Sequence, residues 1–104
     1  MIFPGHFTFI DKINFLQRKI LVNSILYYEH NKNFISDHHY DDCCKELVNL
    51  QVEYGPRFVS DSTYGYVFWD FDGSTGFHLY SRLELSDRYW LDMIINIKLD
   101  RMEG

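Results

Sequence analysis

Residues 27 to 41 read Tyr-Tyr-Glu-His-Asn-Lys-Asn-Phe-Ile-Ser-Asp-His-His-Tyr-Asp, and this stretch holds the end of one helical pattern and the start of the next. Before it, Asp11 is a candidate N-cap for a helix over residues 11–30, where apolar side chains recur at steps of three and four. Polar residues 30–33 break the pattern, and Ser36 stands where a second N-cap belongs. A link this short predicts an antiparallel helical hairpin.

The second helix is predicted to run as far as Gly55-Pro56. Apolar side chains recur from Tyr40 to Tyr54 at alternating steps of three and four. Glycine after the last periodic residue, followed by proline, is typical of a helix C-terminus. Cys43 and Cys44 are adjacent within this helix, which does not suit disulfide geometry, so we expect reduced, partly buried thiols.

Beyond residue 56 the pattern becomes aromatic and rich in turn residues. Residues 64–71 could form a strand or a packed extended loop, and residues 77–85 fit either a helical turn or a strand face. Ser86 is a candidate N-cap for a closing helix. The apolar stripe expected on that helix consists of Trp90, Met93, Ile94 and Ile97.

The expected fold is therefore mainly α, with α+β as the alternative. Residues 1–104 are expected to form a single domain, in which residues 11–55 are the helical hairpin. Residues 56–104 would supply an aromatic loop or short β-hairpin and a C-terminal helix.

Composition limits the function. The formal net charge of −5 repels phosphate backbones, so autonomous nucleic-acid binding is not expected. No window approaches the roughly 18 apolar residues of a membrane span, and the first residues lack the basic and apolar regions of a signal peptide. We expect a cytoplasmic protein without membrane contact.

A cluster of tyrosines and aspartates on the hairpin suits a small ligand. Asp37, Tyr40 and Asp41 stand at i, i+3 and i+4 in the first turn of the second helix, and the hairpin brings Tyr27 and Tyr28 close to them. A tyrosine face can stack on a flat, positively charged ring, and an aspartate can bind ribose hydroxyls or a carboxamide. The alternative is that Asp37 only stabilises the helix N-terminus and the tyrosines edge the core.

The same residues carry a resemblance to a known family. Tyr27-Tyr28, the ten-residue step to Asp37, the Ser-Asp-x-x-Tyr-Asp motif and the following Lys45-Glu46-Leu47 resemble the N-terminal subdomain of NAD-dependent DNA ligases. The resemblance covers about residues 16–54. It implies that Tyr27, Tyr28, Asp37, Tyr40 and Asp41 contact the nicotinamide mononucleotide half of NAD. Many members of the family have His at the position of Tyr28, and His39 replaces a glutamate that often completes a capping box.

A catalytic role is not expected. Ligases continue into a domain with a nucleophilic Lys-x-Asp-Gly lysine, and this chain has only Asp70-Phe71-Asp72-Gly73. Those residues also resemble the first motif of haloacid-dehalogenase-type phosphatases, but about thirty residues remain for the rest of that fold. No metal site is expected.

The second half is similar to the tail of small, mostly phage-borne or prophage-borne ligase-related proteins. We therefore expect a non-catalytic, phage-encoded module in the cytoplasm of a bacterial host. It would bind NAD or nicotinamide mononucleotide, or modulate an NAD-using or ligase partner.

The alternative is an interaction or host-inhibitor protein with the hairpin as scaffold. Its contact surface for a partner or homodimer would lie within residues 64–77, at Tyr66, Phe68, Trp69, Phe71 and Phe77.

Overall fold

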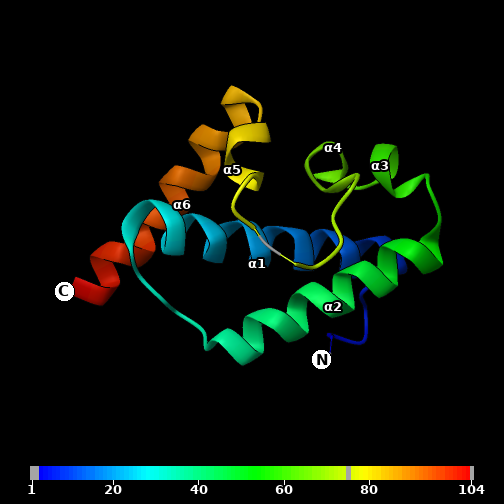
Figure 1. Cartoon of the computed structure of the whole chain (residues 1–104), viewed down its shortest axis with the longest axis horizontal. Helices are drawn as coiled ribbons and strands as arrows, with labels where there is room; N and C mark the ends of the chain where they lie inside the picture. Colours follow the sequence, from blue (N-terminus) through cyan, green and yellow to red (C-terminus); the bar gives the residue numbers. More distant parts are fainter. Residues whose placement is uncertain (1–2, 75, 104) are drawn as a thin grey trace.

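Helix α1 (Phe9–His30) is the longest helix and packs against α2, α5 and α6 (Figure 1). The computed structural model describes residues 3–74 and 76–103 of the chain. Because neighbours cover several sides of α1, it buries nine residues, among them Ile13, Ile20 and Leu26. The fold is mainly α, as predicted.

The first turn of α1 is capped by Thr8, so the predicted N-cap, Asp11, is wrong. The Thr8 hydroxyl accepts from the Asp11 N–H at 3.3 Å, and the Asp11 carboxylate accepts from the Thr8 N–H at 2.9 Å. Asp11 is thus the third helical residue of a capping box. The helix begins two residues earlier than the sequence pattern indicated.

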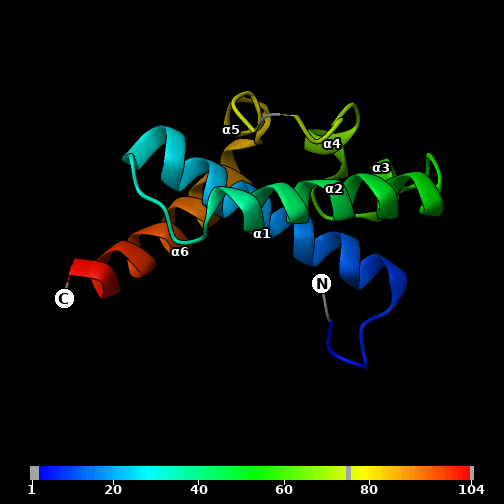
Figure 2. The same cartoon turned by 60° about the horizontal axis from the view of Figure 1, so that its bottom comes forward.

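Helix α2 (Asp37–Tyr54) runs antiparallel to α1 and completes the predicted hairpin (Figure 2). The Ser36 hydroxyl accepts from the His39 N–H at 3.1 Å, as expected for an N-cap. Gly55 ends the helix with φ 98°, a backbone conformation that favours glycine. Cys43 and Cys44 are buried and free.

Short single-turn helices occupy the segment for which a strand was an alternative. They are α3 (Phe58–Asp61), α4 (Gly65–Phe68) and α5 (Leu79–Arg82), and the described residues contain no strand. Tyr64, Val67 and Phe68 are all buried, and their i, i+3, i+4 spacing lets one helical turn direct them to the same side. A strand would have directed Val67 and Phe68 to opposite faces.

Helix α6 (Leu85–Glu103) closes the fold and differs from the prediction in two ways. It begins before Ser86, and the Glu84 carbonyl accepts from the Arg88 N–H at 2.9 Å. Its core face consists of Leu91 and Ile95, which are fully buried, whereas Trp90, Met93 and Ile97 of the predicted stripe are 41–50% exposed. The predicted stripe is therefore wrong.

A tyrosine on α4 holds the start of α6 by two hydrogen bonds. The Tyr66 hydroxyl donates to the Asp87 carboxylate and also accepts from the Glu84 N–H at 3.1 Å. Asp87 lies four and eight residues before Leu91 and Ile95, on the same helical face. The contact therefore lies on the face of α6 that packs inward.

A buried polar network joins α1, α2 and the segment after α3. The Gln17 amide nitrogen donates to Gln51 Oε1 at 3.1 Å and to the Ser62 hydroxyl at 2.9 Å. Gln17 Oε1 accepts from the Tyr64 N–H at 3.1 Å.

Within the described residues, no helix has the length and apolar character needed to cross a membrane.

Candidate functional site

All five residues of the predicted ligand cluster line one cavity of about 340 Å³. Tyr27 and Tyr28 come from the last turns of α1, and Asp37, Tyr40 and Asp41 come from the first turns of α2. The hairpin brings these turns together because α1 and α2 are antiparallel. Ser74 and Gly76, from the loop between α4 and α5, form a further wall.

Two tyrosine rings stand at the mouth of the cavity. The Tyr27 and Tyr28 rings are perpendicular, with centroids 4.9 Å apart, and the Phe77 ring packs edge-on against Tyr28 at 5.3 Å. Tyr27 is 50% exposed and Tyr28 is 42% exposed. The Tyr28 ring is therefore held between two aromatic neighbours, while half of the Tyr27 surface is accessible to a ligand.

Tyr40 forms an inner wall. Its hydroxyl and the Ser24 hydroxyl are 2.6 Å apart, within hydrogen-bond distance. Burial raises the pKa of the Tyr40 phenol well above its usual value of 10.0, although the Ser24 hydrogen bond lowers it in part. The phenol therefore keeps its proton at neutral pH, and Tyr40 can shape the cavity or bind a ligand but cannot act as a base.

Sequence reasoning missed several polar residues of the cavity. These are Asn23, Ser24, Asn33 and Ser74. Asn23 Nδ2 donates to the Lys19 carbonyl at 2.8 Å, but Asn23 Oδ1 is buried and has no hydrogen-bond partner within the described structure. The signal in the sequence was the pair Asn23-Ser24 within an otherwise apolar stretch of α1, since a polar residue on a buried face needs a partner.

The charge of the cavity is negative. Asp37 and Asp41 are exposed at its rim, beside the positive end of the α2 dipole, which stabilises carboxylates. No Lys or Arg is among the described residues that line it. The cavity therefore favours a cation or a neutral ligand rich in hydroxyl and amide groups, and it disfavours a phosphate in its interior.

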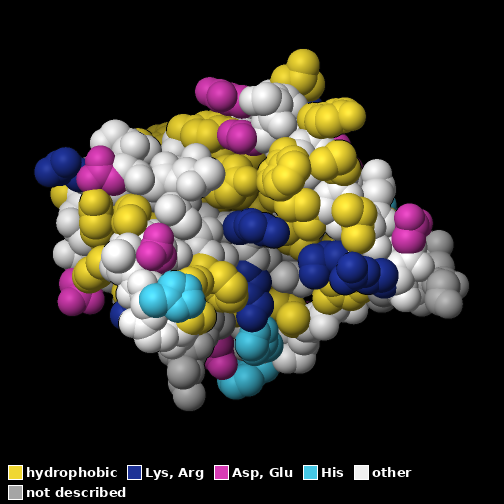
Figure 3. Space-filling view, turned by 180° about the vertical axis from the view of Figure 1, so that it is seen from behind, with side chains coloured by type: hydrophobic (Ala, Val, Ile, Leu, Met, Phe, Trp, Pro, Cys, Tyr) yellow, Lys and Arg dark blue, Asp and Glu magenta, His cyan; other side chains and the backbone are white. Residues whose placement is uncertain are grey.

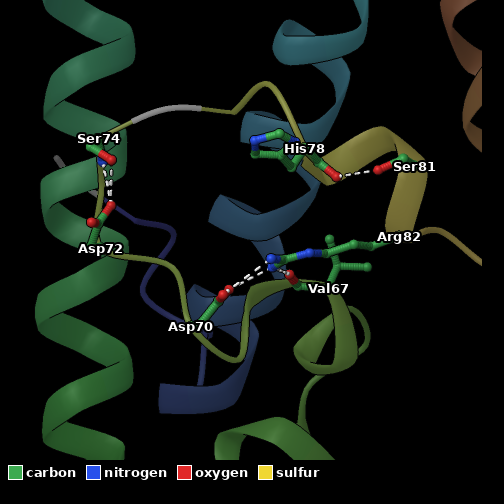
Figure 4. A network of polar contacts seen from close by, with 7 residues as sticks. All are labelled: Val67, Asp70, Asp72, Ser74, His78, Ser81 and Arg82. Carbon is green, nitrogen blue, oxygen red and sulfur yellow. Dashed lines mark hydrogen bonds and ion pairs between the residues drawn. The ribbon is translucent and has the colours of Figure 1, made fainter.

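The phosphatase-like aspartates are engaged elsewhere (Figure 4). The Arg82 guanidinium donates two hydrogen bonds to Asp70, at 2.5 and 3.1 Å, and a third to the Val67 carbonyl at 3.1 Å. Asp72 accepts from the N–H and the hydroxyl of Ser74, at 2.9 and 2.6 Å. These bonds lower the pKa of both carboxyl groups and give them structural roles in the loop. Asp72 thus makes hydrogen bonds within its own turn, whereas the pairing of Asp70 with Arg82 joins the loop to α5.

The proposed aromatic contact surface is not continuous. Phe68 is fully buried, which contradicts its assignment to a surface. Tyr66 is half-buried and bonded to α6, and Phe71 packs edge-on against Phe68 at 5.1 Å. Only Trp69 and Phe77, each 60% exposed, keep a large accessible ring.

The described residues contain no group of three or more His, Cys, Asp or Glu side chains that could hold a metal ion. No protein-family model, curated protein or solved structure matches this chain. The nature of a ligand therefore has to be inferred from the residues that line the cavity.

Proposed function

We propose that the protein is a non-catalytic module that binds the nicotinamide nucleoside portion of nicotinamide mononucleotide or NAD in the hairpin cavity. The observation that carries this proposal is the convergence of Tyr27, Tyr28, Asp37, Tyr40 and Asp41 on one cavity. A volume of about 340 Å³ is at the low end of the range for small-ligand sites, which suits one nucleoside better than a whole dinucleotide.

The chemistry of the lining supports an oxidised nicotinamide ring. That ring is flat and carries a positive charge, so it is attracted both to the tyrosine faces and to the two carboxylates. Asp37 and Asp41 can accept hydrogen bonds from ribose hydroxyls. Because no basic side chain is among the described lining residues, the ligand phosphate would point toward solvent.

This proposal predicts an order of affinities that calorimetry can measure. Nicotinamide riboside, which lacks the phosphate, should bind at least as well as nicotinamide mononucleotide, and NAD should bind with similar or lower affinity. NADH should bind at least about fivefold more weakly than NAD, because its reduced ring has no positive charge and loses roughly 1 kcal/mol of cation–π energy. Equal binding of NAD and NADH, or no heat with any of these ligands at millimolar concentration, would refute the proposal.

Variants at the cavity rim provide a second test of the proposal. Asp41→Ala should weaken binding by about tenfold or more, because hydrogen bonds to charged groups contribute roughly 1.5–3 kcal/mol. Asp42→Ala is the matched control, since Asp42 is the next residue of α2, is exposed and does not line the cavity. Equal losses for the two variants would indicate an unspecific charge effect.

A second candidate function is binding of a protein partner through Trp69 and Phe77, as supported by the exposure of both rings. This function would persist in Asp41→Ala and would be lost in Trp69→Ser, as measured by calorimetry with an NAD-using or ligase protein of the host. The opposite pattern would favour the cavity.

A further inference from the structure

A second, larger hollow of about 720 Å³ lies between α1 and α6. It shares Asn23, Phe34 and Ile35 with the hairpin cavity, but the rim aspartates Asp37 and Asp41 do not line it. We call it the α1–α6 groove. The residues used in the argument are Phe15, Arg18 and Lys19 of α1 and Trp90, Ile94 and Lys98 of α6.

The apolar walls of the groove are faces of α1 and α6 that do not pack into the core. Trp90, Ile94 and Lys98 are spaced four residues apart and so share one face of α6. Leu91 and Ile95 occupy the core face, which leaves Trp90 50% exposed, and Phe15 is 42% exposed across the groove. Exposed apolar surface in a concave position is typical of a docking site.

The groove is positively charged, although the chain as a whole carries −5. Lys19 Nζ lies 5.9 Å from the centre of the Phe15 ring, and Lys98 Nζ lies 5.4 Å from that of Phe34. Arg18, Lys19 and Lys98 form no ion pair within the described part of the chain. Asp11 is the only acidic residue among the described lining, and its carboxylate is bound to Thr8.

Figure 3 shows this combination on the surface. Lys and Arg side chains gather near the middle of the face seen from behind, and hydrophobic side chains border them. An occupant that complements the groove must therefore be both apolar and negatively charged.

The length of the groove points to a helix. Its α1 wall extends from Asp11 to Asn23, which corresponds to about 18 Å, or a little over three helical turns. A helix-in-groove complex places apolar anchors at i, i+3, i+4 and i+7 into such a site. From the groove's shape, exposed rings and unpaired cations, we infer that it docks an acidic amphipathic helix of a protein partner.

Synthetic peptides of about 16 residues provide the probe. The three peptides share Leu and Phe at the anchor positions and carry Glu, Lys or Gln at all other positions. Trp69→Phe leaves Trp90 as the only tryptophan, so its fluorescence reports occupation of the groove directly. We expect saturable binding of the Glu peptide and at least tenfold weaker binding of the Lys and Gln peptides.

Charge variants link the binding to the groove. Arg18→Glu with Lys98→Glu should weaken binding of the Glu peptide at least tenfold, and Arg18→Gln with Lys98→Gln should weaken it less. Lys45→Glu, an exposed position on α2 outside the groove, is the matched control and should leave the affinity unchanged. The glutamine pair keeps the test valid if the charge reversal disturbs folding, as circular dichroism would show.

Three results would overturn the inference. The first is equal affinity for the three peptides or no saturation with the Glu peptide. The second is an unchanged affinity in both pairs of charge variants. The third is a concentration-dependent dimer in sedimentation that Ile94→Glu converts to a monomer, because a second copy would then occupy the groove.

Discussion

The hydroxyls of Ser24 and Tyr40 lie 2.6 Å apart and join α1 to α2 at the inner wall of the hairpin cavity. The backbone of Gly76 packs directly on this pair, and a Cβ at that position would clash with both oxygen atoms. Three segments far apart in sequence therefore meet at one hydrogen bond. Because Gly76 has no side chain, the loop between α4 and α5 can approach the Ser24–Tyr40 pair closely enough to line the cavity.

Gly76→Ala should destabilise the protein and deform the cavity. The added methyl group has to displace the loop or break the Ser24–Tyr40 bond, and overpacking of this kind costs about 1–3 kcal/mol. Urea unfolding followed by circular dichroism measures the loss. Gly5→Ala is the control, because nothing lies within 4 Å of the Cβ it would add. Equal stability of the two variants would mean that the loop does not pack on the pair.

Stability should decrease in alkaline solution. Burial raises the pKa of Cys44 from 9.0 to about 12 and raises the pKa of Tyr40 from 10.0. Below about pH 9 both groups are protonated in the folded and unfolded states, so their contribution is fully present. As the pH rises past 9.0 and then 10.0, the unfolded chain loses these protons first, and each group lowers the free energy of unfolding by at most about 1.4 kcal/mol per pH unit.

Urea unfolding at a series of pH values from about 8 to about 11 tests this dependence. Tyr40→Phe removes one titrating group and should reduce the slope above pH 10. Tyr89→Phe serves as the control, since the Tyr89 side chain is 73% exposed. A Tyr40→Phe slope identical to that of the wild type would contradict the assignment.

Gln17→Leu should destabilise the fold through the groups that it leaves unpaired. Gln51 Oε1 and the buried Tyr64 N–H each lose a hydrogen-bond partner, and an unsatisfied buried group costs about 1–3 kcal/mol. The double variant Gln17→Leu/Gln51→Leu should lose less stability than the sum of the losses in the two single variants. The reason is that the acceptor Gln51 Oε1, which Gln17→Leu alone leaves unpaired, is absent from the double variant. Strict additivity in a urea-unfolding cycle would show that the two amides are not coupled.

The hairpin could be predicted because local signals agree there. Ser36 caps the N-terminus of α2, Gly55 ends the helix, and the apolar residues between them are spaced so that they share one helical face. The start of α1 was predicted less well, since Thr8 and Asp11 are both good capping residues and only their reciprocal bonds distinguish their roles.

The stripe of α6 was not predictable from its own sequence. Trp90, Ile94 and Ile97 form one apolar face, and Leu91 and Ile95 form another. The face that packs inward is distinguished by tertiary contacts, namely the burial of Leu91 and Ile95 in the core and the Tyr66–Asp87 hydrogen bond between residues 21 positions apart. That the five hairpin residues lie around one cavity could be predicted from their positions at helix ends, whereas Asn23 and Ser74 enter the cavity only through tertiary packing.

Tyr27→Ala should weaken nicotinamide binding without a loss of stability. Half of the Tyr27 side chain is exposed, so little core packing is lost. Removal of one aromatic face should cost about 1 kcal/mol, or roughly fivefold in affinity. Tyr27→Phe retains the ring and should bind nearly as well as the wild type, as measured by calorimetry. A large loss in Tyr27→Phe would point to the hydroxyl instead of the ring face.

Asn23→Ala tests whether the unpaired Asn23 Oδ1 recognises the carboxamide of the ligand. That atom is a buried acceptor without a partner within the described structure, and Asn23 lines the hairpin cavity as well as the α1–α6 groove. A ligand N–H group that reached it from the cavity would satisfy it. Nicotinamide mononucleotide offers such a donor, whereas nicotinate mononucleotide presents a carboxylate that would repel Oδ1. The wild type should therefore prefer the amide, and Asn23→Ala should reduce the ratio of the two affinities by about fivefold or more, since a neutral hydrogen bond contributes roughly 1 kcal/mol. A ratio is insensitive to a general loss of stability, so an unchanged ratio would exclude Asn23 as the group that distinguishes amide from acid.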